Sequence, residues 1–259
     1  MTVPVATPSP LPVFEHRLRA LRRTWRGGIF SSLLIPVLFL LGMGVSVGGY
    51  VDRAGTLGVP YLDYLAPGLL ATTAVQIGVG EAMWPVLGSF EWNRLYHAMR
   101  ATPLRPSDLV GGELLYLVLR TGVPALSFLV VMIGFGTVHS GWAPAAVPAA
   151  ILVGLSLSGM VLAFSATIKN DSMFALLFRF GVIPMMLFAG VYFPVEAMPL
   201  VAQWVAYALP LWHGVELCRY ATLGLPSALP VVGHVLYLAI WAGVGYALAR
   251  WRFGRRLSD

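Results

Sequence analysis

Six long apolar runs dominate the 259-residue sequence and restrict what the chain can fold into. They cover residues 29–49, 63–88, 109–135, 143–168, 173–192 and 230–250. A helix needs about 20 mostly apolar residues to cross the hydrocarbon core of a bilayer. Charged residues make up only 11% of the chain, whereas soluble domains contain about 25%. The sequence therefore predicts an all-α, multi-pass membrane protein with six transmembrane helices in a single domain, residues 28–251.

The basic residues predict how these helices are oriented. If the N-terminus is cytoplasmic, most of the 17 basic residues fall in cytoplasmic pieces: Arg17, Arg19, Arg22, Arg23, Arg26, Arg94, Arg100, Arg105, Lys169, Arg250, Arg252, Arg255 and Arg256. Cytoplasmic loops of membrane proteins carry an excess of Arg and Lys. We therefore expect both termini in the cytoplasm, a basic tail over 252–259, and location in the inner (cytoplasmic) membrane. Short basic flanks do not indicate nucleic-acid binding, which needs a folded basic platform.

The N-terminal residues outside the runs divide into two pieces. Residues 1–12 are rich in proline and are expected to be disordered. Residues 13–27 carry apolar side chains at helical spacing between five arginines; these apolar residues are Phe14, Leu18, Leu21 and Trp25. This pattern predicts an amphipathic helix that lies in the membrane interface against anionic lipid headgroups. A solvated basic leader is the alternative.

Residues 193–229 are too long for a turn and too broken by proline for a transmembrane helix. We expect two short helices separated at Pro210. Trp204, Tyr207 and Trp212 would place them at the headgroup level on the outer side, where aromatic residues are enriched.

The chain contains no motif for binding a nucleotide. A phosphate-binding loop ends in Gly-Lys-Ser/Thr, and the single lysine, Lys169, lies between Ile168 and Asn170. Cys218 is the only cysteine, and the five histidines are dispersed along the sequence. We therefore expect no catalytic residue, metal site or cofactor in this chain, so any ATP must be bound by another polypeptide.

The inner loop, residues 89–108, is predicted to contain a short amphipathic helix over 91–100 that stops before Pro103. Trp92, Leu95, Tyr96 and Met99 would share one side of this helix, with Glu91, Arg94 and Arg100 largely on the other. Such a helix can bind in a groove on a soluble partner. From the residues alone, a helix that rests on the bilayer surface is equally consistent.

Four charged residues fall inside the apolar runs: Glu81, Glu113, Arg120 and Arg179. Each costs at least ~2.5–3.5 kcal/mol in hydrocarbon, so each is expected to face protein or water. We expect Glu81 to pair with Arg179 or Arg120. These charges would form a polar lining, a conformational latch, or ion pairs that fix helix packing. An ion-coupled secondary transporter or channel that uses Glu81 and Glu113 is the alternative function.

Three stretches resemble the permease subunits of ABC-type-two exporters, especially the branch with nodulation lipo-oligosaccharide exporters and daunorubicin-type drug exporters. They are residues 64–69 (YLAPGL), residues 101–114 (ATPLR, DLV and GEL), and residues 188–196 (FAGVYFPVE) followed by 209–217 (LPLWHGVEL) and Arg219. The order and spacing of these stretches are similar to the family over residues 14–255.

The resemblance implies two copies of the chain joined to two ABC ATPase subunits, which hold ATP and Mg²⁺. The exported substrate would be lipid-like, a lipo-oligosaccharide or an amphiphilic drug. Residues 91–100 would form the coupling helix on the ATPase, and residues 13–27 an elbow helix beside it. The residues expected to couple to the ATPase are Glu91, Trp92, Arg94, Leu95, Tyr96, Arg100, Thr102 and Arg105. Those expected at the outer gate are Phe193, Pro194, Glu196, Pro210, His213, Glu216 and Arg219. Glu113 would anchor the coupling loop through Arg94 or Arg100.

Overall fold

The computed structural model of the chain describes residues 9–55, 57–227 and 229–258, without the side chains of residues 23–33, 35–36, 45 and 54. The expected disordered leader therefore lies mostly outside the described residues, and the first helix begins at Leu11. Every regular element within the described residues is helical.

The helices, in chain order, have the following bounds. The first half of the chain contains α1 Leu11–Ser46, α2 Gly48–Ala54, α3 Tyr61–Glu91, α4 Leu95–Arg100 and α5 Pro106–Gly134. The second half contains the short η1 Ala143–Ala145, α6 Ala146–Ser165, α7 Ser172–Leu177, the π-helical η2 Phe178–Val182, α8 Ile183–Phe188, η3 Val195–Ala197, α9 Leu200–Ala208, α10 Pro210–Leu223 and α11 Val231–Ser258.

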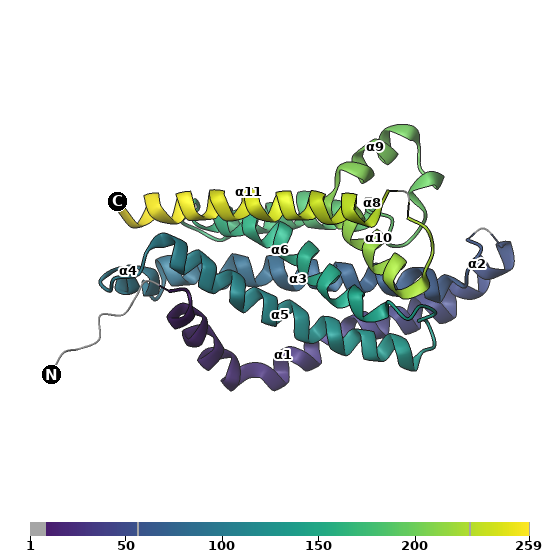
Figure 1. Ribbon diagram of the computed structural model, residues 1–259, viewed down its shortest axis with the longest axis horizontal. Helices are drawn as coiled ribbons and strands as arrows, with labels where there is room; N and C mark the ends of the chain where they lie inside the picture. The colour runs from purple at the N-terminus through teal and green to yellow at the C-terminus, as the bar shows by residue number, and fades with distance from the viewer. Residues whose placement is uncertain (1–8, 56, 228, 259) are drawn as a thin grey trace.

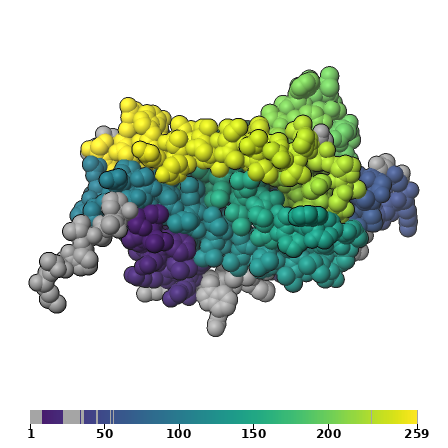
Figure 2. Space-filling model, viewed as in Figure 1, coloured from purple at the N-terminus to yellow at the C-terminus, as the bar shows by residue number. Residues whose placement is uncertain are grey.

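The long helices α3, α5, α6 and α11 run along the long axis of the molecule (Figure 1). The short helix α4 lies at one end of this axis, together with the start of α1 and the end of α11. The short helices α2, α9 and α10 lie at the opposite end, where α9 protrudes from the surface (Figure 2). The molecule therefore has two distinct ends joined by a helical bundle.

Three stretches of helix are long and apolar enough to cross a membrane: Pro106–Gly134, Ala143–Ser165 and Val231–Ser258. They coincide with the predicted runs 109–135, 143–168 and 230–250. Helix α3, which covers the run 63–88, is not among these three, and it carries the polar residues Thr72, Thr73 and Glu81. Most of α3 is buried within the bundle, so its side chains face protein and need not match lipid.

Small residues allow the central helices to approach closely. A Cβ added to Gly245 of α11 would lie 2.9 Å from the backbone carbon of Gly159 in α6. A Cβ added to Gly78 of α3 would lie 2.5 Å from the Ser158 hydroxyl and 3.1 Å from the Gly154 carbonyl oxygen, both in α6. Small residues at helix interfaces are typical of membrane bundles, where close packing replaces the hydrophobic effect.

Two predicted runs differ from the observed helices. Residues 13–27 and most of the run 29–49 belong to one continuous helix, α1, which bends along its length (Figure 1). Gly27, Gly28 and Pro36 lie inside α1 and are the residue types at which helices usually bend. The run 173–192 is not one regular helix, because it contains α7, the π-helical η2 and α8, which ends at Phe188.

Candidate functional site

Helix α4 follows a tight turn at the end of α3. The backbone N–H groups of Trp92 and Asn93 both donate to the carbonyl of Gly88, at 3.0 Å. Arg94 then adopts a left-handed backbone conformation, with φ of 50°. The predicted helix over 91–100 was therefore wrong in its first half, because α3 continues to Glu91 and α4 starts only at Leu95. The left-handed residue changes the chain direction between the two helices.

A buried ion pair and a tyrosine connect α4 to α1 and α5. The Arg17 Nε atom donates to both carboxylate oxygens of Glu113, at 2.8 and 2.9 Å. The Tyr96 hydroxyl donates to Glu113 Oε1 at 2.7 Å and accepts from Arg17 Nη2 at 3.2 Å. Tyr96 is 0% exposed and Glu113 is 2% exposed. Three helices that are distant in sequence are thus joined by one hydrogen-bonded group.

The electrostatics of this group favour the ionised pair. Burial raises the pKa of the Tyr96 hydroxyl, and the Glu113 carboxylate raises it further, so Tyr96 stays protonated and can donate. Burial alone would lower the pKa of Arg17, but the attraction of Glu113 and the hydrogen bonds outweigh it, so the pKa of Arg17 is raised. Glu113 was expected to anchor the coupling loop through Arg94 or Arg100; its partners are instead Arg17 and Tyr96.

An aromatic cluster connects the same region to α11. The rings of Phe90, Tyr96 and Phe253 have centroids 4.7 to 5.3 Å apart. The Arg256 guanidinium lies 4.3 Å from the centre of the Phe90 ring and forms an ion pair with Glu91. We call Arg17, Phe90, Glu91, Tyr96, Glu113, Phe253 and Arg256 the α4 cluster. It attaches α4 to α1, α3, α5 and α11, which leaves α4 little freedom to move alone.

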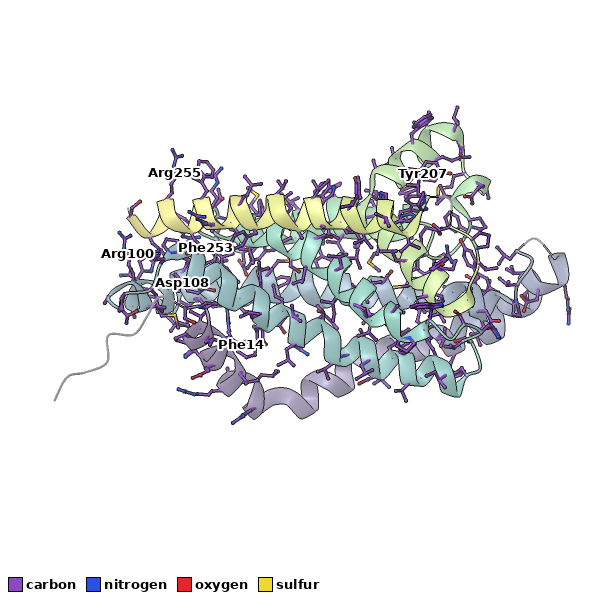
Figure 3. The ribbon with its side chains drawn as sticks, viewed as in Figure 1. Phe14, Arg100, Asp108, Tyr207, Phe253 and Arg255 are labelled. Atoms are coloured by element: carbon purple, nitrogen blue, oxygen red, sulfur yellow. The ribbon has the colours of Figure 1, made fainter. Side chains whose placement is uncertain are left out.

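The predicted coupling residues separate into buried and exposed groups. Tyr96 is buried and Leu95 is half-buried. Glu91 is exposed but is held by Arg256. The other exposed residues are Trp92, which is 66% exposed, Arg94, Arg100, Thr102 and Arg105. Figure 3 shows Arg100 at the same end of the molecule as Asp108, Phe253 and Arg255. An aromatic and basic surface is therefore presented by a loop that is firmly attached to the bundle.

The charged residues inside the apolar runs pair between helices. Arg120 Nε donates to Glu81 Oε1 at 2.7 Å, which confirms one of the two expected partners. The Tyr116 hydroxyl lies 3.5 Å from the other Glu81 oxygen. Arg179 lies in η2 with an exposed side chain, and it has no ion pair within the described part of the chain. Glu81 and Glu113 are thus both neutralised by arginine.

At the opposite end, Arg219 holds the start of the predicted outer segment. Its Nη1 atom donates to Glu216 at 2.8 Å, and its Nη2 atom donates to the Gly190 carbonyl at 2.9 Å. The Tyr64 hydroxyl donates to the same carbonyl at 3.1 Å, and the guanidinium lies 3.9 Å from the Tyr64 ring centre. Gly190 has φ of 72°, a left-handed conformation that glycine adopts at low cost.

A chain of hydrogen bonds continues from Glu216 through two histidines. The Ser227 hydroxyl donates to Glu216 at 3.2 Å and lies 2.7 Å from His234 Nε2. His234 Nδ1 lies 2.8 Å from His213 Nδ1, and His213 Nε2 lies 3.1 Å from the Tyr207 carbonyl. We call Tyr64, Gly190, His213, Glu216, Arg219, Ser227 and His234 the α10 cluster. Tyr207 lies at the end of the molecule opposite to Arg100 (Figure 3).

The number of available protons limits which of these hydrogen bonds can form together. The Tyr207 carbonyl only accepts, so His213 Nε2 must donate to it. In neutral His213 the Nδ1 atom then accepts, which requires a proton on His234 Nδ1. The Ser227 hydroxyl has one proton, so when it donates to Glu216 it must accept from His234, which then needs a proton on Nε2 as well. All four hydrogen bonds together therefore require one proton more than two neutral histidines carry. Burial and the neighbouring His234 lower the pKa of His213 to about 4, so His213 is the neutral acceptor.

The remaining outer-gate residues flank a large cavity. Leu209 is extended and Pro210 begins α10, so the predicted break between two short helices at Pro210 is confirmed. A cavity of about 1090 Å³ lies between α1 and α2 on one side and the segment after α8 on the other. Its walls are mainly apolar and aromatic and include Phe193, Pro194 and Glu196. Pro210, His213 and Arg219 are buried, the last two within the α10 cluster, and none of them lines this cavity.

Several residues of both clusters escaped the sequence analysis. Arg17 is one of five arginines in its segment, and nothing in the sequence distinguishes it from the others. The buried face of α1 is set by the close contact of Val13 with Gly112 of α5, where a Cβ on Gly112 would lie 2.5 Å from the Val13 Cβ. Phe253 and Arg256 belonged to the predicted basic tail. Ser227 and His234 are separated from His213 by a loop, so their spacing carried no signal.

Comparison with known proteins supplies the family. Residues 14–223 match the ABC-2 type transporter family. The chain is 28% identical over 256 residues to Nodulation protein J of Rhizobium leguminosarum bv. viciae, which covers 99% of this chain and 98% of that protein. It is 30% identical over 239 residues to Nodulation protein J of Rhizobium leguminosarum bv. trifolii, which covers 90% of this chain and 89% of that protein. With Nodulation protein J of Rhizobium meliloti (strain 1021), the identity is 27% over 250 residues, or 95% of this chain and 93% of that protein.

The matched region contains the α4 cluster residues up to Glu113, the Glu81–Arg120 pair, and the α10 helix. The apolar helices of the bundle and the match together identify a multi-pass membrane protein of a transport family. The chain belongs to the ABC-2 type transporter family.

Proposed function

We propose that this chain is the permease subunit of an ATP-driven exporter. Two copies would assemble with two cytoplasmic ABC ATPase subunits, which hold ATP and Mg²⁺, and would cross the inner membrane six times each. Both termini would be cytoplasmic, and residues 13–27 would lie in the membrane interface. The family and the similarity to Nodulation protein J over almost the whole chain support this proposal. So does the position of α4 at the same end of the molecule as the start of α1 and the end of α11 (Figure 1).

The observation that carries the proposal is the attachment of α4. Exposed Trp92, Arg94 and Arg100 form a surface that a soluble partner can bind, while buried Tyr96 is hydrogen-bonded to Glu113 of α5 and Arg17 of α1. A displacement of α4 by a partner must therefore displace α1 and α5 as well, or break buried hydrogen bonds. ATP binding can shift the permease only as far as it stabilises one conformation over another. In this proposal, the α4 cluster transmits the effect of ATP binding from the partner subunit to α1 and α5.

The α10 cluster and the cavity define the proposed exit. Helices α9 and α10 would cap the outer end, with exposed Leu200, Val201 and Trp204 of α9 in the outer membrane interface. The cavity of about 1090 Å³ is large and mainly apolar, which suits the acyl or aromatic part of an amphiphile. We propose a lipid-like, lipo-oligosaccharide or amphiphilic drug substrate. Ion-coupled transport through Glu81 and Glu113 would require breaking an arginine pair at each acid.

A co-purification experiment tests the partner. The tagged chain would be isolated from its native membrane in mild detergent, and associated proteins would be identified and counted. We expect one ABC ATPase at equal stoichiometry, with ATP hydrolysis by the complex and none by the chain alone. Recovery of the chain without any ATPase, together with substrate movement by the isolated chain, would contradict the proposal.

A charge-reversal experiment tests the surface. Arg94→Glu with Arg100→Glu should uncouple substrate-stimulated ATP hydrolysis in the assembled complex. Glu91 is less suitable, because its reversal would also break the internal pair with Arg256. Arg53→Glu is the matched control, since Arg53 is exposed at the other end of the molecule, in α2. Equal stimulation in all three proteins would exclude this surface as the coupling site.

A further inference from the structure

A second basic surface lies beside the α4 cluster. A cavity of about 720 Å³ opens where the last turns of α11 pass the start of α5. Arg105, Arg250 and Arg255 line it, together with Trp251. Gly254 of α11 faces the Pro106 ring here, and a Cβ on it would lie at an ordinary contact distance of 3.8 Å from that ring. Of these residues, only Arg105 was considered as part of the coupling surface.

Among the described residues, the three arginines of this pocket have no counter-charge. All three are exposed, and within the described residues none of them forms an ion pair. Asp108, three residues after Arg105, accepts the Arg105 backbone N–H at 2.9 Å and so caps the start of α5. The pocket also borders the N-terminus of a 29-residue helix, whose dipole adds positive potential. A concave surface of this kind favours an anion with several oxygen atoms.

The apolar surface that leads to the pocket indicates what carries this anion. One side of α11 exposes Leu236, Ile240, Val244 and Leu248, at spacings of four residues, and the same side ends at Trp251. Leu236 is 57% exposed and Ile240 is 64% exposed, so no other part of the described chain covers this stripe. The α11 surface is continuous in the space-filling view (Figure 2). Tryptophan at the end of a membrane helix is typical of the headgroup level.

We propose that this pocket binds the phosphate headgroup of an anionic phospholipid. Arg105, Arg250 and Arg255 bind the phosphate, Trp251 lies at the headgroup–acyl boundary, and the apolar stripe of α11 contacts the acyl chains. Basic pockets between helices on the cytoplasmic side of membranes bind such headgroups. The assignment to the inner leaflet rests on the proposed function, which places both termini in the cytoplasm. The binding of a phosphate by the three arginines is independent of that orientation.

The site also explains how lipid can affect coupling. Phe253 and Arg256 of α11 belong to the α4 cluster, and Arg250, Trp251 and Arg255 lie on the same turns of the helix. Figure 3 shows Arg255 projecting away from the bundle while Phe253 lies close to it. A bound headgroup holds the end of α11 against α5, so it stabilises the part of the molecule to which α4 is attached.

Lipid binding to the purified chain, without any ATPase, tests the proposal. The chain in neutral detergent would be titrated with phosphatidylglycerol, phosphatidylcholine or inorganic phosphate, and binding would be read from thermal stability and from native mass spectrometry. We expect phosphatidylglycerol to raise the unfolding temperature and to remain bound, with little effect of phosphatidylcholine or phosphate. Each arginine near an anionic headgroup contributes about fivefold, so Arg250→Gln with Arg255→Gln should weaken the binding roughly thirtyfold.

Two further variants make the test decisive. Arg53→Gln removes an exposed arginine elsewhere and should leave phosphatidylglycerol binding unchanged. Arg105→Gln tests the pocket from α5, in case the double variant folds poorly. Equal binding of the two lipids, unchanged binding in both pocket variants, or a full effect of phosphate alone would overturn the proposal. So would pocket variants that lose ATPase association and keep lipid binding, because the pocket would then be a protein interface.

Discussion

Replacing Glu113 with glutamine is the most informative single change in the α4 cluster. The carboxylate is 2% exposed and receives two hydrogen bonds from Arg17 and one from Tyr96. Glutamine keeps the size of the side chain but removes its charge, so the mostly buried Arg17 guanidinium loses its counter-charge. Breaking a buried ion pair on one side costs about 3–5 kcal/mol. For a chain of this length, that loss corresponds to a decrease in unfolding temperature of about 6–20 °C.

The assay is thermal unfolding of the purified protein in detergent, combined with a double-mutant cycle. Arg17→Gln with Glu113→Gln should recover at least about 1 kcal/mol of the summed losses, because the double variant leaves no unpaired charge. Tyr96→Phe removes two hydrogen bonds and no charge, so its loss should be smaller, about 1–3 kcal/mol. In the assembled transporter, Glu113→Gln should also reduce the transport achieved per ATP hydrolysed.

The control is an ion pair between exposed residues of the same helix. Glu15 and Arg19 of α1 are 3.3 Å apart, with side chains 61% and 76% exposed. Exposed pairs contribute little to stability, so Glu15→Gln should leave the unfolding temperature unchanged. An equally small change for Glu113→Gln, or additive losses in the cycle, would refute the view that the Arg17–Glu113 pair fixes α4 to the bundle.

Three further predictions test the bundle, the intramembrane charges and the α10 cluster. Gly245→Ala should destabilise the protein by about 1–3 kcal/mol through overpacking against α6. The control Gly243→Ala, whose Cβ would lie in open space, should not destabilise it. Equal unfolding temperatures of the two variants would contradict the close contact between α11 and α6. Arg120→Leu should lower the yield of folded protein, because it leaves Glu81 without its partner. Arg179→Leu should preserve the yield, because the Arg179 side chain is exposed. A lower yield for Arg179→Leu than for Arg120→Leu in size-exclusion profiles would contradict this prediction. Because the pKa of His213 is lowered in the folded protein, the unfolded chain binds the proton first as the pH falls, so stability is full above pH 6.5 and declines toward pH 4. His213→Gln should make stability depend less on pH when unfolding is measured across that range. An unchanged slope of stability against pH would contradict this prediction.

Composition and periodicity predicted the general architecture because they depend on solvent. Runs 109–135, 143–168 and 230–250 became α5, α6 and α11, since an apolar segment of this length has few other stable environments. The break at Pro210 was predictable for a local reason, because the residue before proline avoids helical conformation. Helix boundaries elsewhere depended on contacts that are distant in sequence, as in the continuous α1 and the interrupted run 173–192.

The candidate site was predicted in kind more than in detail. The Glu81–Arg120 pair was among the expected pairings, because charged residues in apolar helices need partners. Tyr96 was expected on a partner surface and is buried, because its hydroxyl binds Glu113. Arg17 lies 96 residues from Glu113, so no pattern along the chain could select it from its neighbours. The His213–His234 contact likewise depends on how α10 and α11 pack.

The energy source of transport tests the central claim most directly. The chain and its ATPase would be reconstituted in vesicles, and movement of a labelled amphiphile would be measured with ATP alone, with an ion gradient alone, and with the chain lacking the ATPase. We expect movement only when ATP and both subunits are present, and loss of that movement in the Arg94→Glu, Arg100→Glu variant. Uphill movement by the chain alone, driven by a proton or sodium gradient, would contradict the account.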